Sequence, residues 1–116
     1  MKGLRLILLL VMTLTACGSN TDLSGEAIRG EALVQELGCQ VCHGAADGIG
    51  PSWSGTWGTL RRLVDGSSVE FDAAYVRASI AEPGSQVVSG FDPVMPSFSL
   101  NEADLQAVSA YLKELK

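Results

Sequence analysis

The first helical pattern in the chain lies between Ser24 and Gly38. Ser24 is a favourable N-cap residue and Gly38 a common helix stop, so we expect a helix between them. Gly30 lies in the middle of this stretch, where glycine costs about 1 kcal/mol relative to alanine, and a close crossing with a second helix would explain it. The expected apolar face consists of residues at roughly helical spacing: Ile28, Ala32, Leu33 and Leu37.

Two further helices are predicted in the second half of the chain. Asp72 is suited to cap a helix that runs to a stop at Pro83, and Asn101 is suited to cap a last helix. Tyr111 stands beside the apolar stripe of this last helix and is placed to cover Gly30. The stripe consists of Leu105, Val108, Leu112 and Leu115.

The stretches between these helices lack helical periodicity. Residues 44–58 are rich in glycine and are predicted to form a loop. Asp65-Gly66 is a turn signal, which predicts a small hairpin or an Ω-loop within residues 60–69. Residues 84–100 form a further loop. The pattern as a whole therefore predicts an all-α protein of short helices joined by long loops.

The N-terminal segment has the features of an export signal. Lys2 and Arg5 form a positively charged region, and an almost wholly apolar stretch and then small residues follow. The segment ends in Leu14-Thr15-Ala16-Cys17, which resembles the bacterial lipobox, where the cysteine is lipidated and becomes the N-terminus. The alternative is a cysteine beside an ordinary cleavage site. We expect a lipoprotein signal peptide at residues 1–16, a tether at 17–23 lipidated on Cys17, and one domain at 24–116.

Removal of that signal would leave an acidic chain. Without Lys2 and Arg5, six of the 8 basic side chains remain against 13 acidic ones, a net charge of −7. Nucleic-acid binding requires a basic patch, so we expect no nucleic-acid partner. Acidity also serves solubility, so by itself it identifies no partner.

The most informative stretch is Cys39-Gln40-Val41-Cys42-His43. The C-x-x-C-H pattern is typical of c-type haem attachment, in which both thiols form thioethers with one porphyrin and the histidine binds its iron. A thioredoxin-type motif would require a βαβ pattern, and a structural zinc site would require four Cys or His ligands. A disulfide between Cys39 and Cys42 remains as an alternative, but it leaves His43 unexplained. We predict one haem c, covalently bound through Cys39 and Cys42, with His43 as axial ligand.

The second axial ligand is predicted by elimination. The chain has one histidine, and of its 3 methionines only Met95 lies outside the predicted signal peptide. Pro93 and Pro96 would stiffen the loop that presents its sulfur. Ligation by His and Met raises the reduction potential of a haem. The alternatives are a methionine that fills a gap in the core, or an open sixth position that would suit gas binding or redox catalysis.

Further residues are predicted to contact the haem. The carbonyl of Pro51 is the expected partner of the second ring nitrogen of His43, because such bonds fix the orientation of a metal-bound imidazole. Trp53 and Trp57 offer apolar area, and an indole N–H can donate to a propionate. Phe98 is expected to pack against the haem edge.

Arginine side chains are the candidates for neutralising the haem propionates. Arg77, on the predicted helix after Asp72, is our candidate. Arg61 and Arg62 could serve the same purpose, but each taken alone is better explained as solvent-exposed.

From Gly30 onward the sequence resembles the class I cytochromes c. In that family the first and last helices cross through a glycine and an aromatic residue, and Gly30 and Tyr111 match those positions. The resemblance implies three to five short helices wrapped around one covalent haem. A narrower likeness is to the cytochrome c domain fused to subunit II of haem–copper oxidases and to the monohaem lipoprotein subunit of alternative complex III. It is carried by four stretches: Gly50-Pro51-Ser52-Trp53, Asp65-Gly66, residues 75–80 and residues 90–98. Val34 stands where an aromatic residue is common.

These observations predict a membrane-anchored cytochrome that carries single electrons in a respiratory chain. Its partners would be a quinol-oxidising complex and a haem–copper oxidase, on the periplasmic face of the cell membrane. A fixed electron-transfer subunit of a larger complex and an acceptor for a periplasmic dehydrogenase are the alternatives. No catalytic pair is visible, so we expect neither enzymatic activity nor a small-molecule substrate.

Overall fold

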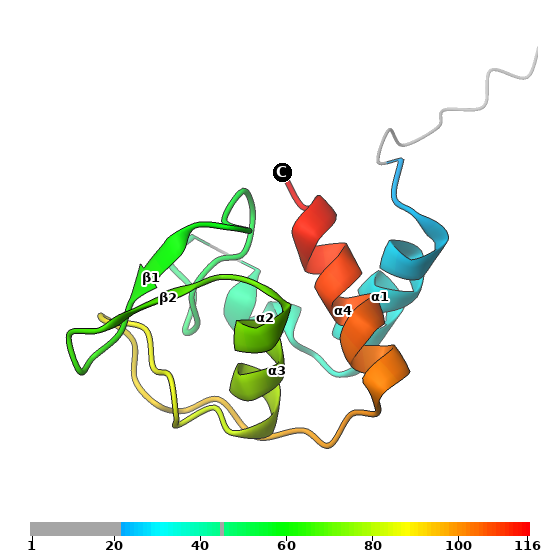
Figure 1. Cartoon of the computed structure of the whole chain (residues 1–116). Helices are drawn as coiled ribbons and strands as arrows, with labels where there is room; N and C mark the ends of the chain where they lie inside the picture. Colours follow the sequence, from blue (N-terminus) through cyan, green and yellow to red (C-terminus); the bar gives the residue numbers. More distant parts are fainter. Residues whose placement is uncertain (1–21, 45) are drawn as a thin grey trace, which may run out of the picture.

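The computed structural model describes residues 22–44 and 46–116, so the predicted signal peptide and Cys17 lie outside the described residues. The described chain forms four helices and one two-stranded sheet (Figure 1). In chain order these are α1 (Gly25–Glu36), α2 (Gln40–His43), β1 (Leu60–Arg62), β2 (Ser68–Glu70), α3 (Ala73–Ala81) and α4 (Glu102–Glu114). None of the helices in these described parts is long and apolar enough to cross a membrane.

The three longer helices begin where the sequence predicts them. The side chains of Ser24, Asp72 and Asn101 each accept a hydrogen bond from a backbone N–H three residues ahead, which satisfies one of the free donors of the first turn. At the end of α1, Gly38 has a φ of +70°, a left-handed conformation that glycine adopts at little cost. Local capping chemistry therefore fixes these boundaries.

Helices α1 and α4 cross in close contact (Figure 1). A Cβ atom added at Gly30 would lie 1.9 Å from the carbonyl oxygen of Ala107 and 2.9 Å from the Cβ of Tyr111. Only glycine fits at this point, which confirms the crossing predicted from Gly30 and Tyr111. Val34 is 1 % exposed and packs with Tyr111 in the same core.

The predicted apolar face of α1 is wrong. Ile28 is 56 % exposed, Ala32 is also exposed, and the buried positions are Ala27, Gly30 and Val34. The buried face includes the small residues Ala27 and Gly30, and at Gly30 the backbones of α1 and α4 approach closely. The larger side chain of Ile28 is left exposed. Leu33 and Leu37 are partly buried: Leu33 packs against the hydrophobic core, and Leu37 lines the large apolar cavity.

The hairpin predicted around Asp65-Gly66 is present. Strands β1 and β2 pair antiparallel with Arg61 opposite Val69, and Gly66 takes a φ of +86° in the turn. After β2, Phe71 and Tyr75 enter the core beside the α1–α4 pair. Figure 1 shows α1 and α4 on one side, the hairpin and α3 on the other, and a long segment without helix or strand returning from α3 to α4. The chain is thus mostly helical with one small sheet.

Candidate functional site

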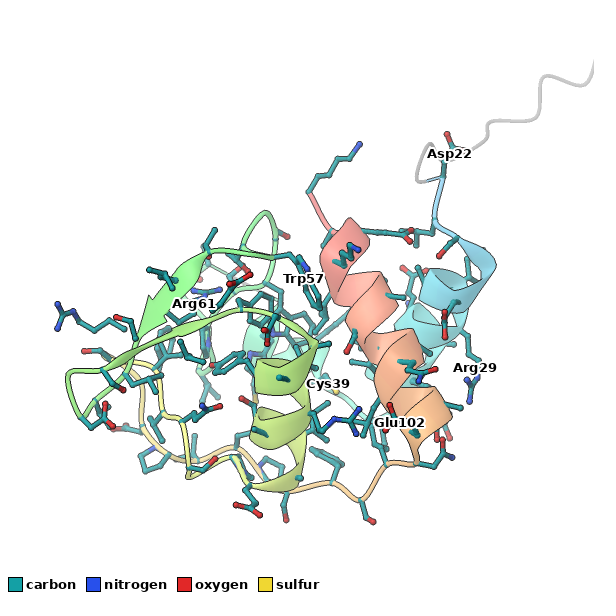
Figure 2. The ribbon with its side chains drawn as sticks, in the orientation of Figure 1. Asp22, Arg29, Cys39, Trp57, Arg61 and Glu102 are labelled. Carbon is teal, nitrogen blue, oxygen red and sulfur yellow. The ribbon has the colours of Figure 1, made fainter. Side chains whose placement is uncertain are left out.

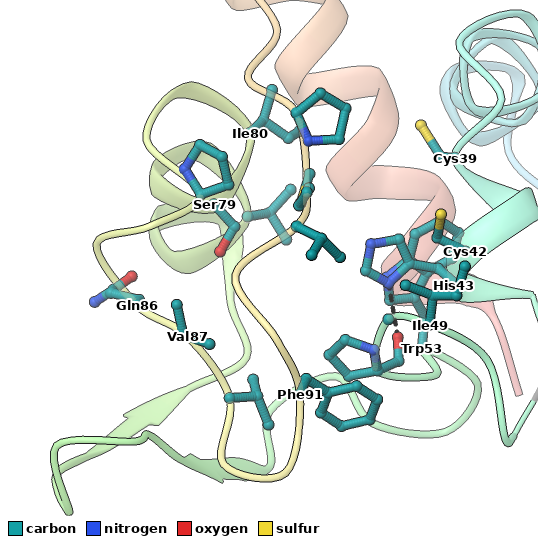
Figure 3. A pocket seen from close by; sticks show the side chains of 18 of the residues that line it. Cys39, Cys42, His43, Ile49, Trp53, Ser79, Ile80, Gln86, Val87 and Phe91 are labelled. Carbon is teal, nitrogen blue, oxygen red and sulfur yellow. Dashed lines mark hydrogen bonds between the residues drawn. The ribbon is translucent and has the colours of Figure 1, made fainter.

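A cavity of about 200 Å³ opens between α2, α3 and the segment that joins α3 to α4 (Figure 3). Its walls are mostly apolar, and they include Val34 from α1 and Val108 and Leu112 from α4. The crossing of α1 and α4 therefore forms the fixed back of the pocket, and the other walls come from short elements and loops. Such a cavity suits a large apolar cofactor.

The C-x-x-C-H residues lie on one wall of this cavity. The four residues Gln40–His43 form α2, and this single turn brings Cys39, Cys42 and His43 to the pocket together (Figure 3). Both cysteines are free thiols, and burial raises the pKa of the Cys39 thiol. Val41, between them, points away from the pocket and is 82 % exposed. The spacing thus presents two thiols and an imidazole to one cavity and leaves the turn's outer face to solvent.

The imidazole of His43 is held from three sides. Its Nδ1 lies 2.8 Å from the carbonyl oxygen of Pro51, the contact that the sequence predicts. The ring of Trp53 stacks on it at 4.7 Å between centroids, and a Cβ added at Gly50 would lie 2.6 Å from its Cε1. Because Nδ1 donates its proton to Pro51, the other ring nitrogen, Nε2, keeps a free lone pair for a metal.

The charge state of His43 agrees with a ligand role. Burial lowers the pKa of this imidazole, and the hydrogen bond to Pro51 acts in the opposite direction with smaller effect. The neutral form is therefore favoured near neutral pH, and neutral imidazole is the form that binds metals.

Met95 lies on the wall supplied by the segment between α3 and α4. The same stretch contributes Pro93, Pro96 and Phe98 to the cavity lining. Met95 and Phe98 are partly buried. The fold thus brings a thioether to the cavity that also receives the imidazole of His43, over 50 positions away in the sequence.

The residues present fit a haem c. Two thiols, one oriented imidazole and one thioether line an apolar cavity, and this donor set matches covalent attachment with His/Met ligation. Two polar atoms on the lining residues, Ser79 Oγ and Gln86 Oε1, are buried without a hydrogen-bond partner in the described part of the chain (Figure 3). Buried polar groups are normally satisfied, so these atoms require a partner from a bound group or an ordered water.

Two predicted contacts lie outside the cavity lining. Arg77 is an exposed residue whose guanidinium forms a bidentate pair with Glu102, 2.6 Å on each side, and it points along the surface. Trp57 packs edge-on against Phe71, 5.7 Å between centroids, and belongs to the core beside the pocket. The structure therefore does not bring Arg77 or Trp57 to the pocket. The carboxylate of Glu102 holds Arg77, and the ring of Phe71 packs against Trp57.

Among the arginines that the structure describes, Arg61 is the one that lines the cavity. Figure 2 labels its side chain. Its guanidinium donates to the carbonyl of Ser52 at 2.7 Å and lies 5.3 Å from the centre of the Phe71 ring. Strand alternation is the signal that could have found it: in β1 the flanking Leu60 and Arg62 are exposed, and the residue between them faces inward. The sequence prediction treated Arg61 as solvent-exposed, and its position in the structure corrects this.

Several apolar lining residues were also not predicted as haem contacts. They lie on β2–α3 and on the following segment, and nothing distinguishes them locally from ordinary core residues. They are Phe71, Tyr75, Val76, Ile80, Val88 and Phe91.

Comparison with known proteins agrees with this site. The family model described as cytochrome c matches residues 27–116. A protein described as cytochrome c-553-like from Synechocystis sp. is 38 % identical over 95 residues, covering 80 % of this chain and 72 % of that protein. Members of the family bind covalent haem c through the spacing found at Cys39 and Cys42. The chain therefore belongs to the cytochrome c family, as a monohaem class I cytochrome c that transfers electrons.

Proposed function

We propose that this cytochrome is a lipid-anchored electron carrier that takes single electrons from a quinol-oxidising complex to a terminal oxidase. The observation that carries the proposal is the presence of one imidazole and one thioether, from His43 and Met95, at a single apolar cavity. When bound, the haem supplies a one-electron Fe(III)/Fe(II) couple. Two protein ligands leave no position for a substrate, which favours electron transfer over catalysis.

The holding of His43 supports fast transfer. Pro51, Trp53 and the close approach of Gly50 fix the imidazole. The ring would therefore not need to move when the iron that it binds gains or loses an electron. An apolar pocket keeps water away, so little solvent has to reorient as well. Low reorganisation is what a carrier requires, because it meets donor and acceptor in turn.

The rim of the pocket offers an approach for redox partners. Ile49 and Val94 are exposed apolar side chains that also line the cavity. An electron would leave through the haem edge near the thioethers, where a partner can approach this rim. The acidic chain favours a partner with a basic face, so exchange rates with the true partner should fall as salt rises.

The anchor would keep the domain near the bilayer. Six residues of tether from Cys17 reach at most roughly 20 Å when extended. Ser24, at the start of α1, is hydrogen-bonded through its backbone N–H and its hydroxyl to Glu114 at 2.9 and 2.8 Å. Such a short tether would permit both a carrier that diffuses in the membrane plane and a fixed subunit of a larger complex.

Membrane fractionation tests the anchor. A Cys17→Ser variant removes the thiol that lipid would modify and leaves every described residue unchanged. We expect the haem-staining wild-type protein in the membrane fraction with acyl chains on Cys17, detected by mass spectrometry, and we expect Cys17→Ser to lack both the acyl chains and the lipoprotein-type cleavage. A wild-type Cys17 that carries no acyl chain would contradict lipidation at this residue.

Separation of mild-detergent extracts by size tests the carrier role. Migration of the haem-staining polypeptide as a small, micelle-bound species supports a diffusing carrier. Migration with a large assembly at constant ratio would contradict it and make the protein a fixed subunit of that assembly.

A further inference from the structure

The segment that carries Met95 makes backbone hydrogen bonds to the rest of the protein only near its two ends, among the residues that the structure describes. No helix or strand forms within residues 82–101, all of which the structure describes. Near its start, Val87 O and Ser89 N hydrogen-bond to the hairpin at Val64 N and Arg62 O, both at 2.9 Å. Near its end, Phe98 N donates to Ile80 O at 2.9 Å.

Between these attachments lies the stretch that presents the sulfur. From Gly90 to Ser97, which are all described, the backbone hydrogen bonds stay within the segment itself. The position of Met95 therefore depends on how firmly the two ends are held.

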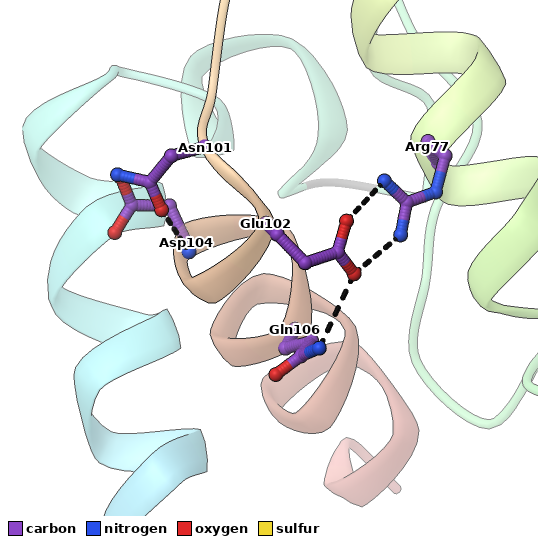
Figure 4. A network of polar contacts seen from close by, with 5 residues as sticks. All are labelled: Arg77, Asn101, Glu102, Asp104 and Gln106. Atoms are coloured by element: carbon purple, nitrogen blue, oxygen red, sulfur yellow. Dashed lines mark hydrogen bonds and ion pairs between the residues drawn. The ribbon is translucent and has the colours of Figure 1, made fainter.

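Arg77 and Glu102 join those two ends (Figure 4). Arg77 lies on α3, where the segment begins, and Glu102 is the first residue of α4, where it ends, 25 positions later. Arg77 Nη1 donates to Glu102 Oε2 and Arg77 Nη2 donates to Glu102 Oε1, each at 2.6 Å, and Gln106 Nε2 donates to Glu102 Oε1 at 3.2 Å. We propose that this pair, the Arg77–Glu102 latch, closes the ligand-bearing segment and acts as a positioning device for Met95. This rests on Met95 being the second axial ligand.

The effect expected of the latch is small and sensitive to salt. Both side chains are about half exposed, and exposed ion pairs usually contribute little. Three features should make this pair stronger than an average surface ion pair. They are its bidentate geometry, the hydrogen bond from the amide of Gln106, and the position of Glu102 at a helix N-terminus. A modest contact is sufficient, because it acts on a segment with few other attachments.

A second ion pair provides a matched control. Arg29 on α1 pairs with Asp104 and donates to the carbonyl of Ala103, so it also holds the first turn of α4. Its arginine is equally exposed, at 50 % against 48 % for Arg77. It ties α4 to α1, however, and not to the start of the Met95 segment.

The experiment measures how fast imidazole replaces Met95 in the oxidised, detergent-solubilised holoprotein of full length. Loss of the sulfur-to-iron charge-transfer band reports the exchange. Arg77→Lys keeps the charge but loses the bidentate fork, and Glu102→Gln keeps the shape but loses the charge. At low salt we expect each to exchange about two- to five-fold faster than wild type. The double variant should be no faster than the single variants, because both remove one interaction.

Two further results sharpen the test. Arg29→Lys should exchange at the wild-type rate, and at about 1 M salt the latch variants should approach wild type. Wild-type exchange rates in Arg77→Lys and Glu102→Gln at low salt would overturn the latch, as would equal acceleration by Arg29→Lys. A wild-type protein that lacks the charge-transfer band would instead overturn ligation by Met95.

Discussion

At the α1–α4 crossing, backbone meets backbone with no room for an added methyl group at Gly30. On the opposite side of the pocket, the Met95 segment has no regular structure and is held at its ends. The two regions enclose the same cavity by different means. The crossing is held by packing between two helices of the polypeptide itself, whereas the segment carries Met95, whose proposed partner is the iron.

This difference predicts a separation of effects. Substitutions at the crossing should lower the free energy of unfolding and leave the haem spectrum of the folded protein unchanged. Substitutions around the pocket should change the haem properties with less effect on stability.

Gly30→Ala should damage the crossing most. The new methyl group would overlap the backbone carbonyl of Ala107, which cannot rotate away, so the helices must separate. We expect a loss of about 3 kcal/mol or more in the free energy of unfolding. Gly25→Ala is the control, because a Cβ there meets nothing within 4 Å. Denaturant unfolding, monitored by circular dichroism, measures the stability of both variants. Equal stability of the two would contradict the close contact at Gly30.

Val34→Ala and Ile28→Ala test which face of α1 is buried. Val34 is 1 % exposed, so its truncation should leave a cavity and cost about 2 kcal/mol. Ile28 is 56 % exposed, and its truncation should change stability by less than about 0.5 kcal/mol. Denaturant unfolding measures both variants. A larger loss of unfolding free energy for Ile28→Ala than for Val34→Ala would support the apolar face predicted from the sequence.

Arg61→Met should act on the haem and not on the crossing. A cation at the pocket wall disfavours the more positive oxidised iron, so its removal should lower the reduction potential. The expected shift is on the order of 40 mV, which corresponds to about 1 kcal/mol for one electron. Arg62→Met is the matched control, because Arg62 is exposed on the other face of β1. Potentiometric titration measures both, and equal potentials in the two variants would contradict a role for Arg61.

Glu114→Gln should have the smallest effect, and its effect should depend on pH. The hydrogen bonds from the backbone N–H and hydroxyl of Ser24 hold the pKa of Glu114 below its ordinary value. A lowered folded pKa means that the stabilisation is present above the unfolded pKa and is lost as pH falls through the folded one. The difference in unfolding midpoint between wild type and Glu114→Gln should therefore shrink as the pH falls below the ordinary glutamate pKa of about 4.3. A difference that does not decrease as the pH is lowered would contradict this assignment.

Local chemistry explains what could be predicted from the sequence. The caps at Ser24, Asp72 and Asn101, the turn at Asp65-Gly66 and the stop at Gly38 each depend on a few neighbouring residues. The contact of His43 with Pro51 was also within reach, because the haem motif demands a partner for the second ring nitrogen.

What could not be predicted depends on the position of distant elements. Helix α1 offers two faces, and only the approach of α4 through Gly30 selects the one with small residues. The choice of Arg61 over Arg77 depends on the pairing of β1 with β2 and on the nearness of Glu102.

The central claim is that one haem c sits between His43 and Met95 and exchanges one electron. The most direct test is a spectroelectrochemical titration of the purified holoprotein from the oxidised to the reduced state. We predict a single one-electron transition, with a sulfur-to-iron charge-transfer band in the oxidised spectrum that disappears on reduction. Absence of that band in the oxidised wild-type protein would contradict His/Met ligation and favour an open sixth position.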